Sequence, residues 1–294
     1  MHSYPKVLAL GHRFIQDILF GETIAEEKVD GSQISFGVLD GVLRIRSHSA
    51  EVILDAPGMF DVAVEQINSI SNDLSPDYIY RGEYLRKPKH NVLCYDRVPA
   101  KNIVIFDIED KDFNPLSYEQ KRVEAERIGL ETVPLLWRNI TKKDTIIDLL
   151  NNNSFLGGTL IEGVVIKNYG KLVEGCKYMV GKYVSEKFKE NMAHKTKMDK
   201  QTDDIISSIV KSLKTEARYY KAIQHLKETG SLLEAPQDIG NLLKEIHQDI
   251  DAEETEYIKD RLFAHYIKKI KGLVCSGFPE WYKEQLLNNL REAS

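Results

Sequence analysis

Residues 27–38 read EKVDGSQISFGV: a lysine, then an aspartate and a glycine, and then a run of strand-forming residues. By itself the Lys28-x-Asp30-Gly31 pattern is weak, because ordinary composition gives it by chance in about one chain in ten of this length. A tight turn with Asp30-Gly31 at its corner is the simpler explanation. The rest of the sequence decides between a turn and a functional motif.

Strand-like and helical segments alternate through the first part of the chain. Runs rich in Val, Ile, Phe and Tyr, separated by Gly, Asp, Asn or Pro, predict strands over residues 33–38, 41–45, 77–80, 102–108 and 159–167. Helical apolar spacing predicts helices over residues 56–71, 117–128 and 142–150. Ser117 followed by Gln120 fits a capping box at the start of the second helix.

The pattern changes after about residue 190. Helical apolar spacing runs through residues 198–228, 238–250, 253–274 and 279–291, with turn signals between these segments and no convincing strand. We therefore predict an α+β fold with two domains. Residues 1–190 should form mainly antiparallel sheets with flanking helices, and residues 191–294 a small all-α domain.

Four further segments follow the Lys28 motif in order along the chain. They are a strand end with Glu83 (YRGEYL, 80–85), an apolar strand with Phe106 (VIFDI, 104–108), a strand with Glu162 and Lys167 at its ends (EGVVIK, 162–167) and a basic segment with Lys182 (177–189). Each has an ordinary explanation as an edge-strand carboxylate, a core aromatic or a solvated lysine. Five such coincidences in one order are far rarer than one.

This ordered set resembles the covalent nucleotidyltransferase superfamily, which contains ATP-dependent ligases and messenger-RNA capping enzymes. The Lys28 motif is most similar to the opening motif of RNA ligases, and the helical last third is similar to the RNA ligase 2-like branch. The resemblance covers about residues 4–190. It implies a nucleotidyltransferase (ATP-grasp-like) domain in an ATP-dependent RNA ligase. Such an enzyme joins 3′-hydroxyl and 5′-phosphate ends through lysyl-AMP and an adenylated 5′ end.

The resemblance also implies roles for individual residues. It implies catalytic roles for Lys28, Asp30, Arg46, Glu83, Glu162 and Lys182. It implies that the nucleotide is bound by Glu27, Lys28, Gln33, Phe106, Lys167 and Lys182. Phe106 would stack on adenine, and Lys182 and Lys167 would contact phosphates. Asp30 and Gln33 would support the later, polynucleotide-dependent steps.

The chemistry explains why these residue types are needed. An amine must be neutral to attack a phosphate, yet a free lysine has a pKa of about 10.4. Nearby cations would lower the pKa of the Lys28 nucleophile. By the resemblance, Glu83 would bind the ribose or a metal ion and Glu162 would organise metal-bound water. Carboxylates with several waters suit Mg²⁺ or Mn²⁺ rather than zinc.

Two positions depart from the family pattern. The basic residue that follows the nucleophile is Arg44, Arg46 or His48, depending on the alignment, and we favour Arg46. The last motif of the family often carries two lysines separated by one residue, but here only Lys182 is clear. Lys177 or Lys187 would compensate.

Charge and cysteine content indicate the partners and the compartment. The formal net charge of −5 excludes a uniformly basic coat, so RNA, as separate ends or as a nicked duplex, must meet a local basic surface. Residues 177–200 carry seven Lys against three acidic residues. Three scattered cysteines and a short N-terminal apolar run predict a cytoplasmic protein, which we expect to be a monomer without a membrane span.

Two alternatives stay open at this point. The first is a DNA ligase or a capping guanylyltransferase of the same superfamily, and the helical last third counts against it. The second is a catalytically silent nucleotide- or RNA-binding protein on the same scaffold. Lys28, Glu83, Glu162 and Lys182 are all present, which counts against the second alternative.

Overall fold

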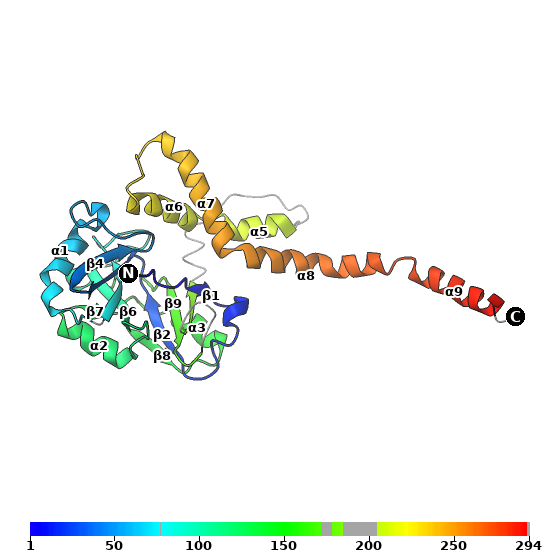
Figure 1. Ribbon diagram of the computed structural model, residues 1–294, viewed down its shortest axis with the longest axis horizontal. Helices are drawn as coiled ribbons and strands as arrows, with labels where there is room; N and C mark the ends of the chain where they lie inside the picture. Colours follow the sequence, from blue (N-terminus) through cyan, green and yellow to red (C-terminus); the bar gives the residue numbers. More distant parts are fainter. Residues whose placement is uncertain (77, 172–177, 185–204, 293–294) are drawn as a thin grey trace. The chain divides into compact units, whose positions relative to one another are not determined.

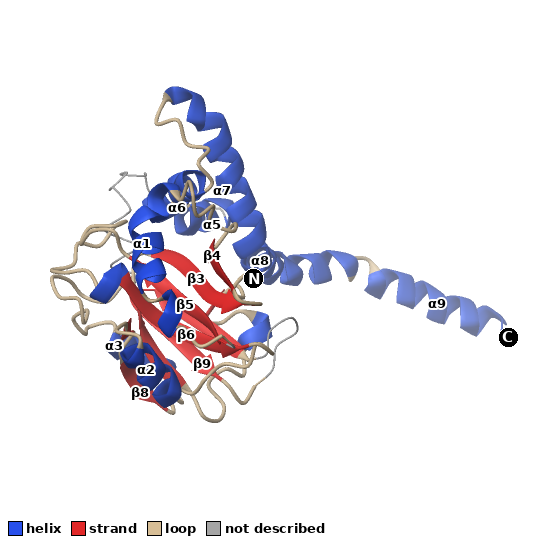
Figure 2. Ribbon diagram, turned by 60° about the vertical axis from the view of Figure 1, so that its left-hand side comes forward, coloured by secondary structure: helices blue, strands red, loops and turns tan. Residues whose placement is uncertain are grey.

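The computed structural model describes residues 1–76, 78–171, 178–184 and 205–292 (Figures 1 and 2). Its strands are β1 (Leu8–Ala9), β2 (Ile24–Lys28), β3 (Ser32–Leu39), β4 (Val42–Ser47), β5 (Tyr78–Tyr84), β6 (Ile103–Asp110), β7 (Glu131–Thr132), β8 (Leu135–Arg138), β9 (Gly163–Asn168) and β10 (Met179–Val184). Its α-helices are α1 (Asp61–Ser69), α2 (Tyr118–Arg127), α3 (Lys143–Leu149), α5 (Ile205–Leu213), α6 (Glu216–Glu228), α7 (Ile239–Glu253), α8 (Thr255–Val274) and α9 (Phe278–Glu292).

The strands form two five-stranded sheets. Sheet A has the order β1-β10-β9-β2-β8, and sheet B has the order β4-β3-β5-β6-β7. Only the short pairs β1–β10 and β6–β7 are parallel, and the other described pairs are antiparallel. The predicted α+β class with mainly antiparallel sheets is therefore confirmed.

Local sequence explains several element boundaries. Asp40 and Gly41 both have positive φ angles, as a tight two-residue turn between β3 and β4 requires. Ser117 and Gln120 form the predicted capping box at the start of α2. The described part of the helix predicted over residues 198–228 is two helices, α5 and α6. They are separate because the side chain of Thr215 caps the start of α6.

Each sheet has one apolar face and one polar face. The apolar face of sheet B packs against α1 and α2, with Ile34, Phe36 and Tyr80 fully buried in that core. The apolar face of sheet A packs Ala25 and Ile166 against residues of α3 and the N-terminal segment. Because side chains alternate along a strand, Glu26 and Lys28 on β2 and Lys167 on β9 lie on the opposite, inner face of sheet A, and Glu83 on β5 and Asp107 on β6 lie on the inner face of sheet B.

A buried ion network joins the two inner faces. The Lys167 ammonium on β9 lies 2.9 Å from the Glu26 carboxylate on β2 and 3.2 Å from the Asp107 carboxylate on β6. Lys121 reaches in from α2 and pairs with Glu26. The hydroxyl of Tyr4 donates to Asp107 over 2.8 Å. These contacts fix sheet A against sheet B at one end of the space between them.

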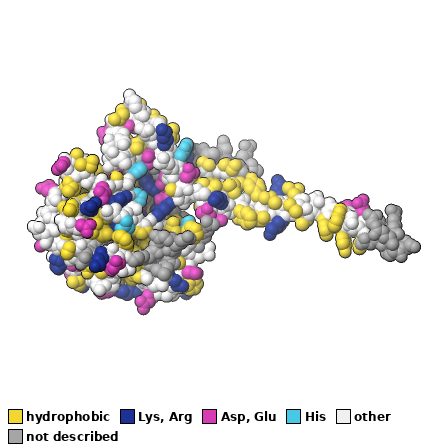
Figure 3. All heavy atoms as spheres, in the orientation of Figure 1, with side chains coloured by type: hydrophobic (Ala, Val, Ile, Leu, Met, Phe, Trp, Pro, Cys, Tyr) yellow, Lys and Arg dark blue, Asp and Glu magenta, His cyan; other side chains and the backbone are white. Residues whose placement is uncertain are grey.

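The chain divides into two compact units. The first comprises residues 1–196 and 215–248, and the second residues 197–214 and 249–294. In the second unit α5 packs against α8, and hydrophobic side chains gather on the exposed surface of α8 (Figure 3). The expected boundary near residue 190 lies outside the described residues and stays a prediction. Among the described helices, none is long and apolar enough to cross a membrane.

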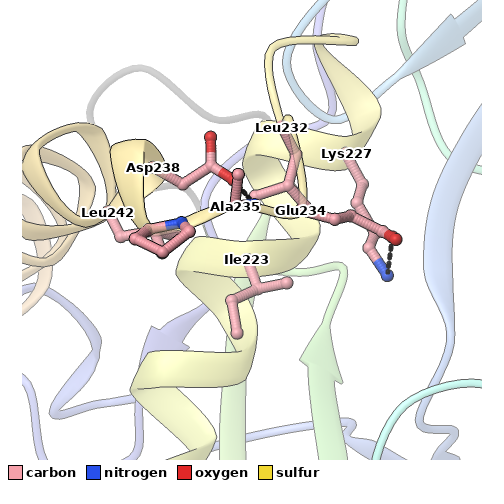
Figure 4. Close-up of a pocket in the computed structure, with 8 residues that line it drawn as sticks. Ile223, Lys227, Leu232, Glu234, Ala235, Asp238 and Leu242 are labelled. Atoms are coloured by element: carbon pink, nitrogen blue, oxygen red, sulfur yellow. Dashed lines mark hydrogen bonds and ion pairs between the residues drawn. The ribbon is translucent and has the colours of Figure 1, made fainter.

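Helix α6 turns into α7 through a short connection that belongs to the first unit. The Asp238 carboxylate accepts hydrogen bonds from the backbone N–H groups of Leu233 (3.0 Å) and Ala235 (3.0 Å). Figure 4 shows the pocket of about 390 Å³ on this connection, with Ile223 below it and the Lys227–Glu234 ion pair at its side. These contacts hold the connection between α6 and α7 in one conformation.

Replacing Phe36 tests the packing of sheet B. Phe36 is fully buried, and its ring stacks on Tyr80 with centroids 5.2 Å apart. Phe36→Ala should lower the free energy of unfolding by about 3–5 kcal/mol, because it leaves a cavity in the core. Urea unfolding would measure the change, and Val42→Ala, at an exposed position, is the control. A loss below about 1 kcal/mol for Phe36→Ala would contradict this account of the core.

Candidate active site

Lys28 is the last residue of β2, and its side chain reaches the carboxylate of Glu162. The β2–β9 register pairs Lys28 with Gly163, so Glu162 directly precedes the strand beside the lysine. The Lys28 Nζ donates to Glu162 Oε1 over 2.7 Å and to Oε2 over 2.6 Å. The Glu162 side chain is only 7% exposed, whereas that of Lys28 is 28% exposed. The amine is thus held in place, on a side chain that is only partly buried.

Glu83 approaches the same amine from sheet B. It lies on the inner face of β5, paired in register with Gln33 on β3. Its Oε1 accepts a hydrogen bond of 3.0 Å from the backbone N–H of Gly31. The carboxylates of Glu83 and Glu162 are close enough to Lys28 for both to act on its charge. Lys28, Glu83 and Glu162 are therefore brought together from three separate strands or strand ends.

The electrostatics of the site differ from the sequence-based expectation. Burial lowers the pKa of Lys28, but the carboxylates of Glu162 and Glu83 outweigh it and raise the pKa above its ordinary value. We expected nearby cations to lower this pKa. Without a bound cation the nearest charges are carboxylates, so the lysine is held as an ammonium ion.

The two carboxylates themselves are poorly compensated. Burial raises the pKa of Glu83 to about 8, although Lys28 pulls it down. Burial likewise raises the pKa of Glu162 to about 7, against the opposing effects of Lys28 and Lys182. Two buried carboxylates with raised pKa values would be stabilised as anions by an added cation.

The donor set fits a hard divalent cation. Glu83 and Glu162 supply carboxylate oxygens, the ligands that Mg²⁺ uses together with waters and substrate phosphates. No group of three or more His, Cys, Asp or Glu side chains is arranged around a metal position in the part of the chain that the structure describes. A cation here would therefore take its remaining ligands from water and phosphate oxygens.

Asp30 organises the loop opposite the lysine. Its Oδ2 accepts hydrogen bonds of 2.8 Å from the backbone N–H groups of Val92 and Leu93. Its own N–H donates to the Tyr95 hydroxyl over 2.8 Å. These bonds occupy the Asp30 carboxylate within the protein and hold the 91–95 loop over the motif.

Gly31 has no space for a side chain. A Cβ atom there would lie 2.6 Å from the Tyr84 carbonyl oxygen and 2.8 Å from the Glu83 side chain. The Gly31 N–H is also the donor to Glu83. Glycine is thus required for the close approach of the β2–β3 connection to β5.

Phe106 lies farther along the inner faces, at the ion network. Its half-buried ring meets Tyr4 edge to face, with centroids 5.1 Å apart. Lys167 is buried between Glu26 and Asp107, with its ammonium 6.0 Å from the Phe106 centroid. Lys182 lies on β10 opposite Val165, and its charge acts on Glu162.

Three further predicted site residues have partners other than Lys28. The side chain of Glu27 points to the other face of β2, where it accepts hydrogen bonds from Ser154 and the Phe155 N–H. Arg46 on β4 donates to the carbonyl oxygens of Met1 and Ser49, each at 3.4 Å. Gln33 lies beside Glu83 in register and meets His48 at 3.3 Å.

The basic position after the nucleophile and the second lysine of the last motif each had more than one candidate residue. Arg44 is exposed and lies 3.6 Å from Glu51. Arg46 is half-buried, on the same inner face of sheet B as Gln33. Lys177 and Lys187 lie outside the described residues.

Sequence reasoning singled out Lys167 but missed the residues that pair with it or lie beside it in the ion network: Glu26, Asp107 and Lys121. Glu26 stands two residues before Lys28, so strand alternation alone places it on the same face. Asp107 directly follows Phe106 within the quoted strand. Nothing in the sequence pointed to Lys121, because a lysine in the amphipathic segment 117–128 ordinarily lies in solvent.

Comparison with known families decides the classification. The sequence matches the family described as RNA ligase over residues 21–184, more than half of the chain. The chain belongs to the RNA ligase family. The matched region begins before β2 and ends at β10, and it contains Lys28, Glu83, Glu162 and Lys182. No curated protein shows significant sequence similarity to the chain.

Solved structures share the fold. Naegleria gruberi RNA ligase with PPi is 15% identical, with a TM-score of 0.51 over 65% of this chain and 58% of that one. A mutant of that ligase with ATP and Mn is 15% identical, with a TM-score of 0.52 over 65% and 57%. A second mutant with ATP and Mn is 16% identical, with a TM-score of 0.51 over 64% and 58%. The chain thus aligns with less than two thirds of the length of those ligase chains.

The raised pKa of Glu83 gives a pH-dependent prediction. Glu83→Gln should raise the free energy of unfolding by about 1–3 kcal/mol near pH 8.5 and change it little near pH 5. The folded pKa of about 8 lies above the ordinary 4.5, so ionisation of Glu83 costs the native protein stability as pH rises through this interval. The amide oxygen can still accept from Gly31, so that hydrogen bond is kept.

Denaturant unfolding at the two pH values measures the difference. Glu65→Gln, at an exposed position of α1, is the matched control and should show no such pH dependence. Equal stabilities of Glu83→Gln and the unmodified protein at both pH values would contradict the poorly compensated state of Glu83.

Proposed function

We propose that this protein is an ATP-dependent RNA ligase of the RNA ligase 2-like branch, with Lys28 as the nucleophile. The observation that carries the proposal is the cluster of Lys28, held by Glu162 and faced by Glu83, in which the lysine side chain is 28% exposed. Both carboxylates keep raised pKa values, so the cluster is poorly compensated within the protein.

The first step transfers AMP to the protein. The Lys28 amine, once deprotonated, attacks the α-phosphorus of ATP and a P–N bond forms. The bond from that phosphorus to the oxygen shared with the β-phosphate breaks, and pyrophosphate leaves. The Glu162 carboxylate lies 2.6 Å from Nζ and holds the amine in place, and the ammonium proton leaves to solvent water before the attack.

The later steps use RNA. The 5′-phosphate of one RNA end attacks the lysyl-AMP, which forms a 5′–5′ pyrophosphate linkage and frees Lys28. The 3′-hydroxyl of the other end then attacks the activated 5′-phosphate, so that a phosphodiester forms and AMP leaves. Asp30 would act in these steps by holding the 91–95 loop beside the lysine. Gln33 and Arg46 extend the polar inner face of sheet B in the same direction.

ATP and Mg²⁺ or Mn²⁺ are the proposed cofactors. The matched Naegleria gruberi ligase variants were solved with ATP and Mn. In this chain Glu83 and Glu162 would hold the cation, which would offset phosphate charge and weaken the hold of the carboxylates on the Lys28 proton. Phe106 would stack on adenine, with Lys182 toward the phosphates and the backbone of Glu27 at the edge of the nucleotide. Lys167 was also predicted to contact phosphates, but its ammonium donates to the Phe106 carbonyl oxygen, so we propose that it supports the base-binding residue.

The C-terminal part, residues 191–294, is proposed to grip RNA. Helix α8 exposes Lys268, Lys269 and Lys271 together with Phe263 and Tyr266. Lysines neutralise phosphates and aromatic rings stack on bases, so this combination suits single strands or nicked duplexes. The exposed thiols of Cys94 and Cys275 suit a reducing compartment, and we place the enzyme in the cytoplasm as an RNA-repair ligase.

Replacing the nucleophile tests the proposal directly. Lys28→Met should abolish the covalent adenylate without unfolding the protein, because methionine keeps the length of the side chain and removes the amine. Incubation with ATP and Mn²⁺, followed by intact mass measurement, detects the added AMP. Lys111→Met, at an exposed position, is the control and should adenylate normally. An adenylate formed at full level by Lys28→Met would refute the assignment.

Replacing the stacking aromatic tests the orientation of the nucleotide. Phe106→Ala should weaken ATP binding by about 1–3 kcal/mol, the contribution of one base–aromatic stack. Calorimetric titration measures it, and Phe20→Ala, which is 64% exposed, serves as the matched control. Unchanged ATP affinity for Phe106→Ala would assign Phe106 to the core instead.

A further inference from the structure

Helix α6 contacts the loop that carries the nucleophile motif. The side-chain Nε2 of Gln224 lies 2.7 Å from Ser32 Oγ and 3.4 Å from the Gly31 carbonyl oxygen. Gln224 lies 40 residues beyond the end of the family match at residue 184. Residues 215–248, which include α6, nevertheless belong to the same compact unit as the two sheets.

The orientation of the Gln224 carboxamide follows from its neighbours. The Gly31 carbonyl can only accept a hydrogen bond, and Glu228 Oε1, 3.0 Å from the same Nε2, accepts when it is ionised. The amino end of the amide must therefore face these oxygens. Gln224 is a fixed donor, held by the helix neighbour one turn later.

Two residues of the 86–93 loop grip the same backbone from another side. Asn91 Nδ2 donates to the Gly31 carbonyl oxygen over 2.7 Å. His90 Nδ1 accepts from the Arg86 N–H at 3.0 Å, so its Nε2 carries the hydrogen and donates to Ser32 Oγ at 2.8 Å. Burial lowers the pKa of His90 to about 4, which keeps the ring neutral and in this tautomer at neutral pH.

The gripped backbone leads directly to the reacting groups. The Gly31 N–H donates to Glu83, and Lys28 is three residues away on the strand that precedes this turn. Because the Gly31 N–H is hydrogen-bonded to the Glu83 carboxylate, a displacement of this peptide lengthens that bond or moves the Glu83 side chain with it. The position of Gly31 and Ser32 therefore sets how Lys28 and Glu83 face each other.

We propose that Gln224 is a positioning residue for lysyl-AMP formation, and that α6 belongs functionally to the adenylyl-transfer unit. The hydrogen bond from Gln224 to Ser32 holds the 30–32 turn in the geometry that the nucleophile needs. The inference rests on the proposed function of Lys28. It also moves the functional limit of the nucleotide site past residue 190, to the end of α6 at Glu228.

A double-mutant cycle in the full chain tests the proposal. Gln224→Met keeps the length of the side chain and removes the donor, and Ser32→Ala removes the acceptor. Each change should lower the maximal rate of lysyl-AMP formation about 3–10-fold, the rate equivalent of one hydrogen bond. The KM for ATP should change less than about twofold, and the double variant should be no slower than the slower single variant.

Controls separate positioning from folding. Gln248→Met, at an exposed position of α7, should adenylate at the rate of the unmodified protein. The melting temperatures of Gln224→Met and the unmodified protein should agree within a few degrees. A merely structural role would instead lower the melting temperature in step with the rate.

Three results would overturn the inference: an undiminished rate for Gln224→Met, a rate loss that follows thermal destabilisation, or multiplying effects in the double variant. Absence of lysyl-AMP in the unmodified protein would overturn the proposed function itself, and this inference with it. The two failures are therefore distinguishable from the unmodified sample alone.

Discussion

The buried ammonium group of Lys167 fixes the distance between the two sheets. It lies between Glu26 of sheet A and Asp107 of sheet B, and all three side chains are at most 1% exposed. Removing one partner of a buried pair leaves an uncompensated charge, which costs about 3–5 kcal/mol. The sheets can therefore neither separate nor slide without a large loss. Every contact of Lys28 with groups from sheet B depends on this fixed spacing.

The two ends of the inter-sheet space differ in how well their charges are compensated. At the closed end, burial raises the pKa of Asp107, but Lys167 and Lys121 outweigh it and hold the pKa below its ordinary value. At the open end, Glu83 and Glu162 keep raised pKa values despite the neighbouring lysine. The first group of charges is complete within the protein and holds it together. In the second group the neighbouring lysine does not offset the burial of the two carboxylates. Such an excess of buried negative charge is typical of a site that binds a cation together with a nucleotide.

The sequence predicted the parts of the site that lie within short motifs. Lys28, Glu83 and Glu162 each stand at a strand end that local composition reveals, and the resemblance to a family supplied their order. Lys121 and Gln224 could not be found in this way. Both occupy helices whose polar positions ordinarily face solvent, and only long-range packing brings them to Glu26 and Ser32. The raised pKa of Lys28 was also missed, because charge balance in a buried site depends on which groups fold around it.

The order of strands in sheet A has a consequence for biosynthesis. Sheet B contains residues 32–132, so all of its partners leave the ribosome close together. Sheet A places β10 between β1 and β9, and β1 pairs with residues more than 170 positions later. The nascent chain must therefore carry the unpaired N-terminal segment until Val184 has emerged. During that interval the apolar face around Ala25 lacks part of its cover, and exposed apolar surface of this kind promotes aggregation of partly folded chains.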